Sequence, residues 1–261
     1  MKAPGARCIG RFAVKVALVA ALPVARARAA DPAPQPAAKS VTVFAAASLV
    51  DAFKVIGAAF EKAHPNWATQ FNFAGSPTLV QQLEQGAQAD VFAAADEANM
   101  SKVAALGELT TPAQTFATNA LVIAVPAGNP KHIATLADLT KGGLLLALAA
   151  PSVPAGKYAA EAFAKAGLGV PTASQEENVR AVLNKVALNE VDGGIVYVTD
   201  ARAAAGKVEA IAIPERFNVV ARYPIAPLKH AANPDGAAAF VAFVLSPERR
   251  AVLEKFGFMA P

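Results

Sequence analysis

The chain has 261 residues, enough for one large domain or two modest ones, and 54% of them are hydrophobic while 17% are charged, which excludes an intrinsically disordered protein. The net charge of +4 comes from the N-terminus, because residues 1–29 hold six basic and no acidic side chains, and 18 basic and 20 acidic ones remain after them. No later stripe of basic residues with interleaved aromatics follows, so we expect no nucleic-acid partner.

The N-terminal segment 1–29 has the pattern of a secretory signal peptide. Three basic residues precede an apolar run at 12–24, which is too short to span a membrane, and an A-x-A cleavage pattern follows at 27–29, with a second candidate two residues earlier. The segment 30–39 is proline-rich and reads as a linker. The only cysteine, Cys8, lies ahead of the apolar run, so the mature chain has no thiol chemistry. We expect a cleaved, soluble protein in the periplasm.

The exported chain opens with a predicted strand at 41–44, a small-residue turn, and a helix at about 49–63. Ser48 stands where an N-cap belongs, and Asp51 follows three residues later in an S-x-x-D variant of the capping box. Free N–H groups and a partial positive charge make a helix N-terminus a ready anion site. Two interpretations of Ser48 stay open on this stretch alone: it only caps its helix, or it also binds an anion.

The same unit repeats twice along the chain. A strand is predicted at 67–73 and a helix over 76–85, where Ser76 precedes a proline and is expected to be a second serine N-cap. A third strand follows at 90–95 and a helix at 97–106. The order β-α-β-α-β-α predicts a mostly parallel sheet with helices on both faces.

Two long strands divide the rest of the chain, one at 118–125 and one at 218–228. Two α/β units joined by two such strands predict two lobes, the first made of residues 40–118 and 218–261 and the second of 119–217. The elements expected from the second unit onward are a strand at 144–149, a helix at 158–166, a helix at 174–190 with a Ser174/Glu177 capping box, a strand at 191–198, a short helix capped by Thr199 or Asp200, a strand at 208–213, and closing helices over 235–256.

Neutral hydrogen-bond donors gather at the predicted carboxyl ends of the strands, where open α/β sheets bind their ligands. They are Ser48, Ser76, the helix start at Ala155, the pair Asn178–Val179 in a first helical turn, and Tyr197. None is acidic, basic or a histidine, so we expect no catalysis, no cofactor and no metal held directly by side chains. A protonated anion such as hydrogen phosphate needs an acceptor for its O–H, and leaving that donor buried without one is unfavourable. A donor-only site therefore favours dianions such as sulfate, molybdate or tungstate.

Six segments, in order, resemble the periplasmic molybdate-binding proteins of molybdate ABC transporters. They are VTVFAAASL, FAGSPTL, ADVFAAAD, VPAGKYAAEA, ENVRAVL and GIVYVTDA, and the resemblance runs from about residue 40 to the final KFGF. It implies a two-lobed α/β fold of the type II periplasmic-binding class, in which each lobe has a mostly parallel sheet flanked by helices. It also implies molybdate or tungstate as ligand, an ABC permease as partner, and, we expect, a monomer.

Carried over residue by residue, the resemblance implies a specific ligand set. Its members are the side chains of Ser48, Ser76 and Tyr197 and the backbone amides of Ala155 and Val179, with the amides of the two serines expected to add to them. One departure is Pro77, which stands where related proteins often have a serine- or glycine-rich run and which removes one backbone N–H.

Other readings of these residues stay open from sequence. Tyr197 is equally consistent with a core aromatic residue, and His64, His132 and His230 lie among polar or turn residues, typical of surface histidines. The pair Glu176–Glu177 fits a helix start better than a metal site.

The alternative functions are a binding protein for another oxyanion such as sulfate, a secreted serine hydrolase, and the sensing domain of a transcription regulator. The hydrolase would use Ser48 or Ser76, yet neither lies in a G-x-S-x-G motif and no base is placed beside either. No helix-turn-helix segment is present, and the signal peptide argues against the regulator.

Overall fold

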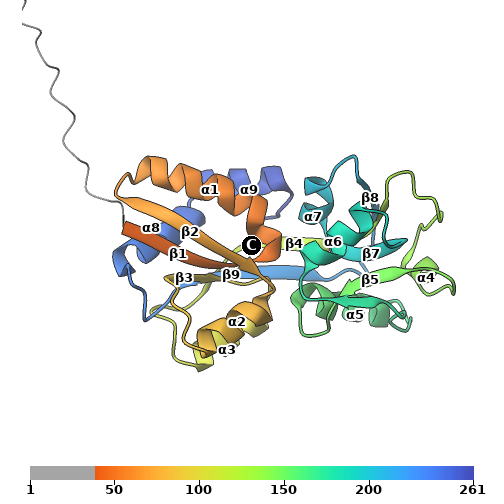
Figure 1. The fold of residues 1–261 in the computed structure, drawn as a ribbon, viewed down its shortest axis with the longest axis horizontal. Helices are drawn as coiled ribbons and strands as arrows, with labels where there is room; N and C mark the ends of the chain where they lie inside the picture. Colours follow the sequence, from red (N-terminus) through yellow and green to blue (C-terminus); the bar gives the residue numbers. More distant parts are fainter. Residues whose placement is uncertain (1–38) are drawn as a thin grey trace, which may run out of the picture. The chain divides into compact units, whose positions relative to one another are not determined.

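A computed structural model describes residues 39–261 (Figure 1). The predicted signal peptide at 1–29, and the predicted linker at 30–39 apart from its last residue, lie outside the described range. That last residue, Lys39, belongs to the first strand, where it pairs with Trp67. No helix within 39–261 has the length and apolar character needed to cross a membrane.

The described strands hydrogen-bond in the order β2-β1-β3-β9-β4-β7-β5-β6, and β8 pairs with β4. Pairing is parallel for β1 with β2 and β3 and for β5 with β6 and β7, and it is antiparallel for every pair that contains β4 or β9. The strands are β1 (Lys39–Ala46), β2 (Trp67–Ala74), β3 (Val91–Ala93), β4 (Gln114–Pro126), β5 (Leu146–Ala149), β6 (Ser174–Glu176), β7 (Gly193–Tyr197), β8 (Val208–Ala212) and β9 (Val220–Pro227).

Helices connect and cover these strands. They are the short 3-10 helix η1 (Ala47–Leu49) and the α-helices α1 (Val50–Ala63), α2 (Ser76–Glu84), α3 (Glu97–Ala105), α4 (Leu136–Leu139), α5 (Pro154–Lys165), α6 (Val179–Ala187), α7 (Val198–Ala203), α8 (Pro234–Leu245) and α9 (Pro247–Phe256). Most lie within a few residues of the predicted positions, since apolar periodicity is a strong local signal.

Figure 1 shows the two halves that the sequence predicts. β1 to β3, α1 to α3 and the C-terminal helices α8 and α9 gather on one side, and β5 to β8 with α4 to α7 gather on the other. β4 and β9 run between them side by side, and β4 pairs with β9 of the first sheet and with β7 and β8 of the second. The predicted two-lobed α/β architecture with two crossing strands is confirmed, while the exact lobe boundaries stay a prediction.

The strand β1 lies at the centre of the first half because it has a partner on each edge. Its side chains alternate between two cores: Val41 and Val43 pack in the cluster that contains Phe53 of α1, and Phe44 packs in a second cluster with Phe92. All five side chains are at most 5% exposed. This burial on both faces holds the end of β1, and the turn that follows it, in a fixed position.

The structure corrects the predicted helix at 174–190. Residues 174–176 form the edge strand β6, whose Ser174 pairs with Ala147 of β5, and α6 begins only at Val179. Asn178 is the N-cap, and its side-chain oxygen accepts a hydrogen bond from the N–H of Ala181 at 3.0 Å. The predicted Ser174/Glu177 capping box is therefore wrong. A short polar strand lacks apolar alternation, so its pairing with β5 is visible only in the fold.

The predicted cap of the helix after β7 also needs correction. Tyr197 is the N-cap of α7, so neither Thr199 nor Asp200 occupies that position. Asp200 still acts at this helix start, because its carboxylate accepts a hydrogen bond from the N–H of Tyr197 at 3.2 Å.

Candidate ligand-binding site

One pocket lies where several helices begin. The strand β1 runs directly into η1 there, and the first residues of α2, α5 and α6 meet it from other segments of the chain. The pocket encloses about 220 Å3, part of which is open to solvent. Its lining consists of Ala46, Ala47, Ser48, Ala74, Gly75, Ser76, Ala95, Val153, Pro154, Ala155, Asn178, Val179 and Tyr197.

All five residues predicted for the site line this pocket: Ser48, Ser76, Ala155, Val179 and Tyr197. Each is less than 5% exposed. They come from both halves of the molecule, since the two serines follow β1 and β2, and the other three lie at the starts of α5 and α6 and at the end of β7. The sequence thus selected positions that the fold brings together.

The roles of the two serines as helix caps are corrected. Ser48 lies inside η1, and the helix α1 begins at Val50 with Leu49 at the N-cap. Ser76 is the first residue of α2, whose N-cap is Gly75, and Pro77 follows it within the first turn. Neither serine makes a side-chain cap, so the S-x-x-D capping box predicted for Ser48 is wrong. Pro77 does not line the pocket, and its effect on the number of donors stays a prediction.

Both serine hydroxyls instead meet partners far from them in the chain. The Ser48 Oγ lies 2.9 Å from the Tyr223 hydroxyl, and the Ser76 Oγ accepts a hydrogen bond from the N–H of Ala95 at 3.1 Å. A backbone N–H can only donate, so the Ser76 proton is left for another acceptor. Tyr223 lies on β9 and is fully buried.

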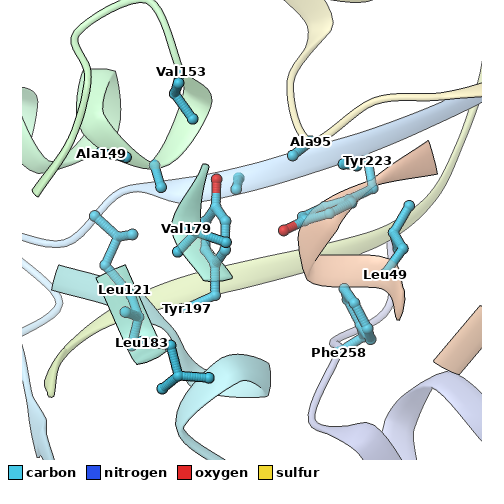
Figure 2. Packing of buried hydrophobic residues seen from close by; sticks show 14 of the residues in the cluster. Leu49, Ala95, Leu121, Ala149, Val153, Val179, Leu183, Tyr197, Tyr223 and Phe258 are labelled. Carbon is cyan, nitrogen blue, oxygen red and sulfur yellow. The ribbon is translucent and has the colours of Figure 1, made fainter. Parts of the chain in front are cut away.

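Tyr197 presents an unpaired hydroxyl at the pocket. It is 1% exposed, and its hydroxyl oxygen has no hydrogen-bond partner within the part of the chain that the structure describes. Its ring packs edge-on against Tyr223, with the ring centroids 5.9 Å apart, and Figure 2 shows the two rings beside each other near Val179. Burial raises the pKa of the Tyr197 hydroxyl well above its ordinary value, so it stays a donor. A buried donor without a partner is unfavourable, which indicates that a ligand supplies one.

The pocket lining contains no charged side chain. The N-terminal ends of α2, α5 and α6 supply positive potential in place of a cation, and their first N–H groups lack partners within the helix. This arrangement suits a small anion, because it meets the negative charge with several dipoles and avoids the cost of burying an ion pair.

An ion-pair network starts one residue beyond Val179. The guanidinium of Arg180 approaches Asp200 (Nε to Oδ1) and Asp51 (Nη2 to Oδ2), both at 2.6 Å. Asp51 lies on α1 and the other two lie on α6 and α7, so the network links the two halves. Burial raises the pKa of Asp200 to about 6, although Arg180 and the N–H of Tyr197 oppose the shift.

The hydrolase alternative gains no base from the structure. His132 and His230 are exposed as expected, but His64 is half-buried, because its ring packs 4.7 Å from that of Phe60 and 5.1 Å from that of Trp67. Within residues 39–261, neither site serine hydrogen-bonds to a histidine. In the same range no cluster of three or more His, Cys, Asp or Glu side chains is arranged to hold a metal ion.

Sequence reasoning missed the residues beneath the pocket, above all Tyr223 and Asn119. Both are fully buried, and Asn119 donates to the hydroxyl of Thr199 at 2.9 Å. A signal was present, since an asparagine inside the apolar strand TNALVIAV needs partners for its amide. The two hydroxyls that its amide nitrogen meets, those of Thr199 and Tyr223, however, come from other parts of the chain.

Comparison with known proteins gives a consistent result. The family model described as bacterial extracellular solute-binding protein matches residues 41–259. The chain is similar to the molybdate-binding protein ModA of Mycobacterium tuberculosis, at 45% identity over 89% of this chain and 90% of that protein. The corresponding figures for ModA of Escherichia coli are 33%, 84% and 88%. The structure of the periplasmic molybdate-binding protein of Azotobacter vinelandii superposes with a TM-score of 0.75 at 19% identity, covering 85% of this chain and 99% of that one. The predicted type II periplasmic-binding fold is confirmed.

Proposed function

Because the chain belongs to the bacterial extracellular solute-binding proteins, we propose that it binds molybdate in the pocket between its two halves and delivers it to an ABC permease. Its ModA relatives are molybdate-binding proteins, and the resemblance noted in the sequence points the same way. The single observation that carries the proposal is the pocket lining, which offers hydroxyls and helix-start amides and no charged side chain. The family is one of binding proteins, so no catalytic residue is assigned.

The ligand set we propose is the one expected from sequence. The hydroxyls of Ser48, Ser76 and Tyr197 and the backbone amides of Ala155 and Val179 donate to the oxygens of the anion. Support comes from the burial of all five residues, from the unpaired Tyr197 hydroxyl, and from the serine oxygens, which already have partners in the protein. A dianion without a proton suits such a site, because it accepts hydrogen bonds only.

Tungstate is proposed as a second ligand, since it is a tetrahedral dianion of nearly the same size as molybdate. Another such oxyanion, sulfate, remains the alternative. We further propose that the lobes comprise residues 40–118 with 218–261, and 119–217, and that they close on the ligand by bending at the crossing strands β4 and β9. An anion held by donors from both lobes favours the closed form over the open one.

Export and assembly follow from the same proposal. A signal peptide at 1–29 would bring the protein to the periplasm, where we expect it to act as a monomer that meets the membrane permease. Mature protein from the native host should begin between residues 28 and 31, and recovery of stable protein with an intact Met1 would contradict export.

Calorimetric titration of the purified protein with molybdate, tungstate, sulfate and phosphate tests the function. We expect molybdate and tungstate to bind tightly and phosphate to bind weakly, and increasingly so as pH falls and phosphate gains a second proton. Phosphate binding as tight as molybdate binding, or no binding of either, would refute the proposal. Turnover of ester or phosphate substrates, or stoichiometric labelling of Ser48 by a serine-directed reagent, would support the hydrolase instead.

A further inference from the structure

A buried series of hydrogen bonds leads away from the Ser48 hydroxyl at the pocket. Its other members, Tyr223, Asn119 and Thr199, are not part of the proposed ligand set. Behind Ser48 stands Tyr223 of β9, with 2.9 Å between the two hydroxyl oxygens. Behind Tyr223 stands Asn119 of β4, whose side-chain nitrogen is 3.5 Å from the tyrosine oxygen and 2.9 Å from the Thr199 hydroxyl. All four residues are at most 5% exposed, so water does not readily replace these partners.

The amide of Asn119 has only one orientation that satisfies its surroundings. Its Oδ1 accepts a hydrogen bond from the backbone N–H of Ala120 at 3.0 Å, and a backbone N–H can only donate. The Nδ2 group must therefore face Thr199 and Tyr223. An amide nitrogen carries two protons and accepts none, so Asn119 donates to both hydroxyls.

This orientation decides where the single proton of Tyr223 goes. Its oxygen receives the amide proton of Asn119, so its own proton cannot point there. Among residues 39–261, the only other group that meets this hydroxyl with hydrogen-bond geometry is the Ser48 Oγ, because the nearby Tyr197 hydroxyl has no hydrogen-bond partner. Tyr223 therefore donates to Ser48, and Ser48 keeps its own proton for the pocket. Burial raises the pKa of Tyr223, which keeps the hydroxyl protonated and able to donate.

We propose that Tyr223, oriented by Asn119, is a specificity-determining positioning residue that makes the Ser48 hydroxyl a hydrogen-bond donor toward the bound anion. The inference rests on the proposed function of the same pocket and explains how it rejects protonated anions. The Ser76 hydroxyl is oriented in the same way, because its oxygen accepts a hydrogen bond from the N–H of Ala95 and its proton remains available to donate. If hydrogen phosphate entered, its O–H would need an acceptor, and the Ser48 oxygen, which already accepts from Tyr223, could offer only its one remaining lone pair, with its own proton turned away from that phosphate oxygen.

Sulfate and hydrogen phosphate form the matched ligand pair for a test, because both are tetrahedral dianions and one carries a proton. The dissociation constants of both are measured by competition against molybdate, at a pH where phosphate is mainly the hydrogen phosphate dianion. Tyr223→Phe removes the donor behind Ser48, and Tyr158→Phe is the matched control, since Tyr158 is the only other tyrosine outside the pocket lining. We expect Tyr223→Phe to weaken sulfate and molybdate binding about five- to tenfold and phosphate binding at most about twofold, so that the preference for sulfate shrinks by more than about twofold.

A second variant, Asn119→Asp, is expected to reverse the direction of the hydrogen bonds from Asn119 through Tyr223 to Ser48. A carboxylate at this position accepts the Tyr223 proton, so Tyr223 would accept from Ser48 and the Ser48 oxygen would become free to accept the O–H of hydrogen phosphate. The added negative charge weakens both dianions alike, so the ratio of the two constants is the readout. We expect this ratio to move toward phosphate further than in Tyr223→Phe.

The outcomes separate this inference from the proposed function. If Tyr223→Phe raised the dissociation constants of sulfate and phosphate by the same factor, Tyr223 would have only a structural role. That result would overturn the inference and leave the proposal of molybdate binding intact. A similar change of the ratio in Tyr158→Phe would overturn it too. A wild-type protein that binds no oxyanion would refute the proposed function itself. If Asn119→Asp does not fold, the pair of tyrosine variants decides the matter.

Discussion

Beside the pocket, the two halves of the molecule come into close contact at Gly75, the N-cap of α2. A β-carbon on it would lie 2.5 Å from the backbone oxygen of Glu177, just before α6, whereas ordinary contacts are 3.4–4 Å. Its backbone angles, φ −58° and ψ 139°, are open to any residue, so alanine causes no local strain. Gly75→Ala therefore acts on the approach of the halves. Relieving the contact requires them to separate by about 1 Å.

The magnitude follows from that overlap. Overpacking of this kind costs about 1–3 kcal/mol, and here the cost falls on the closed form that holds the ligand. Molybdate affinity should therefore drop about five- to over a hundredfold. Without ligand, the halves can relieve the contact by opening, so the melting temperature of the free protein should stay near the wild-type value.

The assay is calorimetric titration with molybdate, together with thermal melting with and without ligand. Gly142→Ala is the matched control, because a β-carbon there meets nothing within 4 Å. It should change neither the affinity nor the melting temperature. Unchanged molybdate affinity in Gly75→Ala would refute the reasoning that the ligand-bound form needs this close approach.

The other predictions concern single groups of the fold and the pocket. Ser48→Ala and Tyr197→Phe should each weaken molybdate about ten- to over a hundredfold in titration, the loss of one hydrogen bond to a charged ligand of about 1.5–3 kcal/mol; unchanged affinity in both would place the ligand elsewhere. Molybdate at about 100 times its dissociation constant should raise the free energy of unfolding by roughly 2.7 kcal/mol, seen as a higher melting temperature. Gly156→Ala should lower the melting temperature even without ligand, because a β-carbon there collides with the carbonyl oxygens of Ala149 and Ala150 in the same half. Since burial raises the pKa of Asp200 from 3.8 to about 6, the folded protein holds a proton between these values that the unfolded chain has lost. The contribution of this residue to stability should therefore fall, by up to about 3 kcal/mol, as pH rises through that range, and denaturant titration should show Asp200→Asn without this slope.

Local patterns were sufficient for the order of most elements and for the positions of the candidate site. Strands and helices alternate with a clear change of apolar period, and the junctions carry small, hydroxyl or proline residues. Ser48, Ser76 and Tyr197 were found because each stands at or just after the end of a strand, and such ends meet at one place in α/β sheets. β6 was missed because three polar residues at a sheet edge carry no periodic signal.

The tertiary structure decided which group each polar side chain meets. Ser48 and Ser76 both read as helix caps, yet Ser48 meets Tyr223, 175 residues away, and Arg180 pairs with Asp51, 129 residues away. A side-chain cap and a buried hydrogen bond each contribute about 1 kcal/mol, so the local pattern alone does not select between them. Packing of the two halves decides which of these hydrogen bonds forms, because it brings the distant partner within hydrogen-bond distance and excludes the water that would compete for the side chain. The sequence by itself determined where donors would stand, and only the packed fold determined in which direction each of them points.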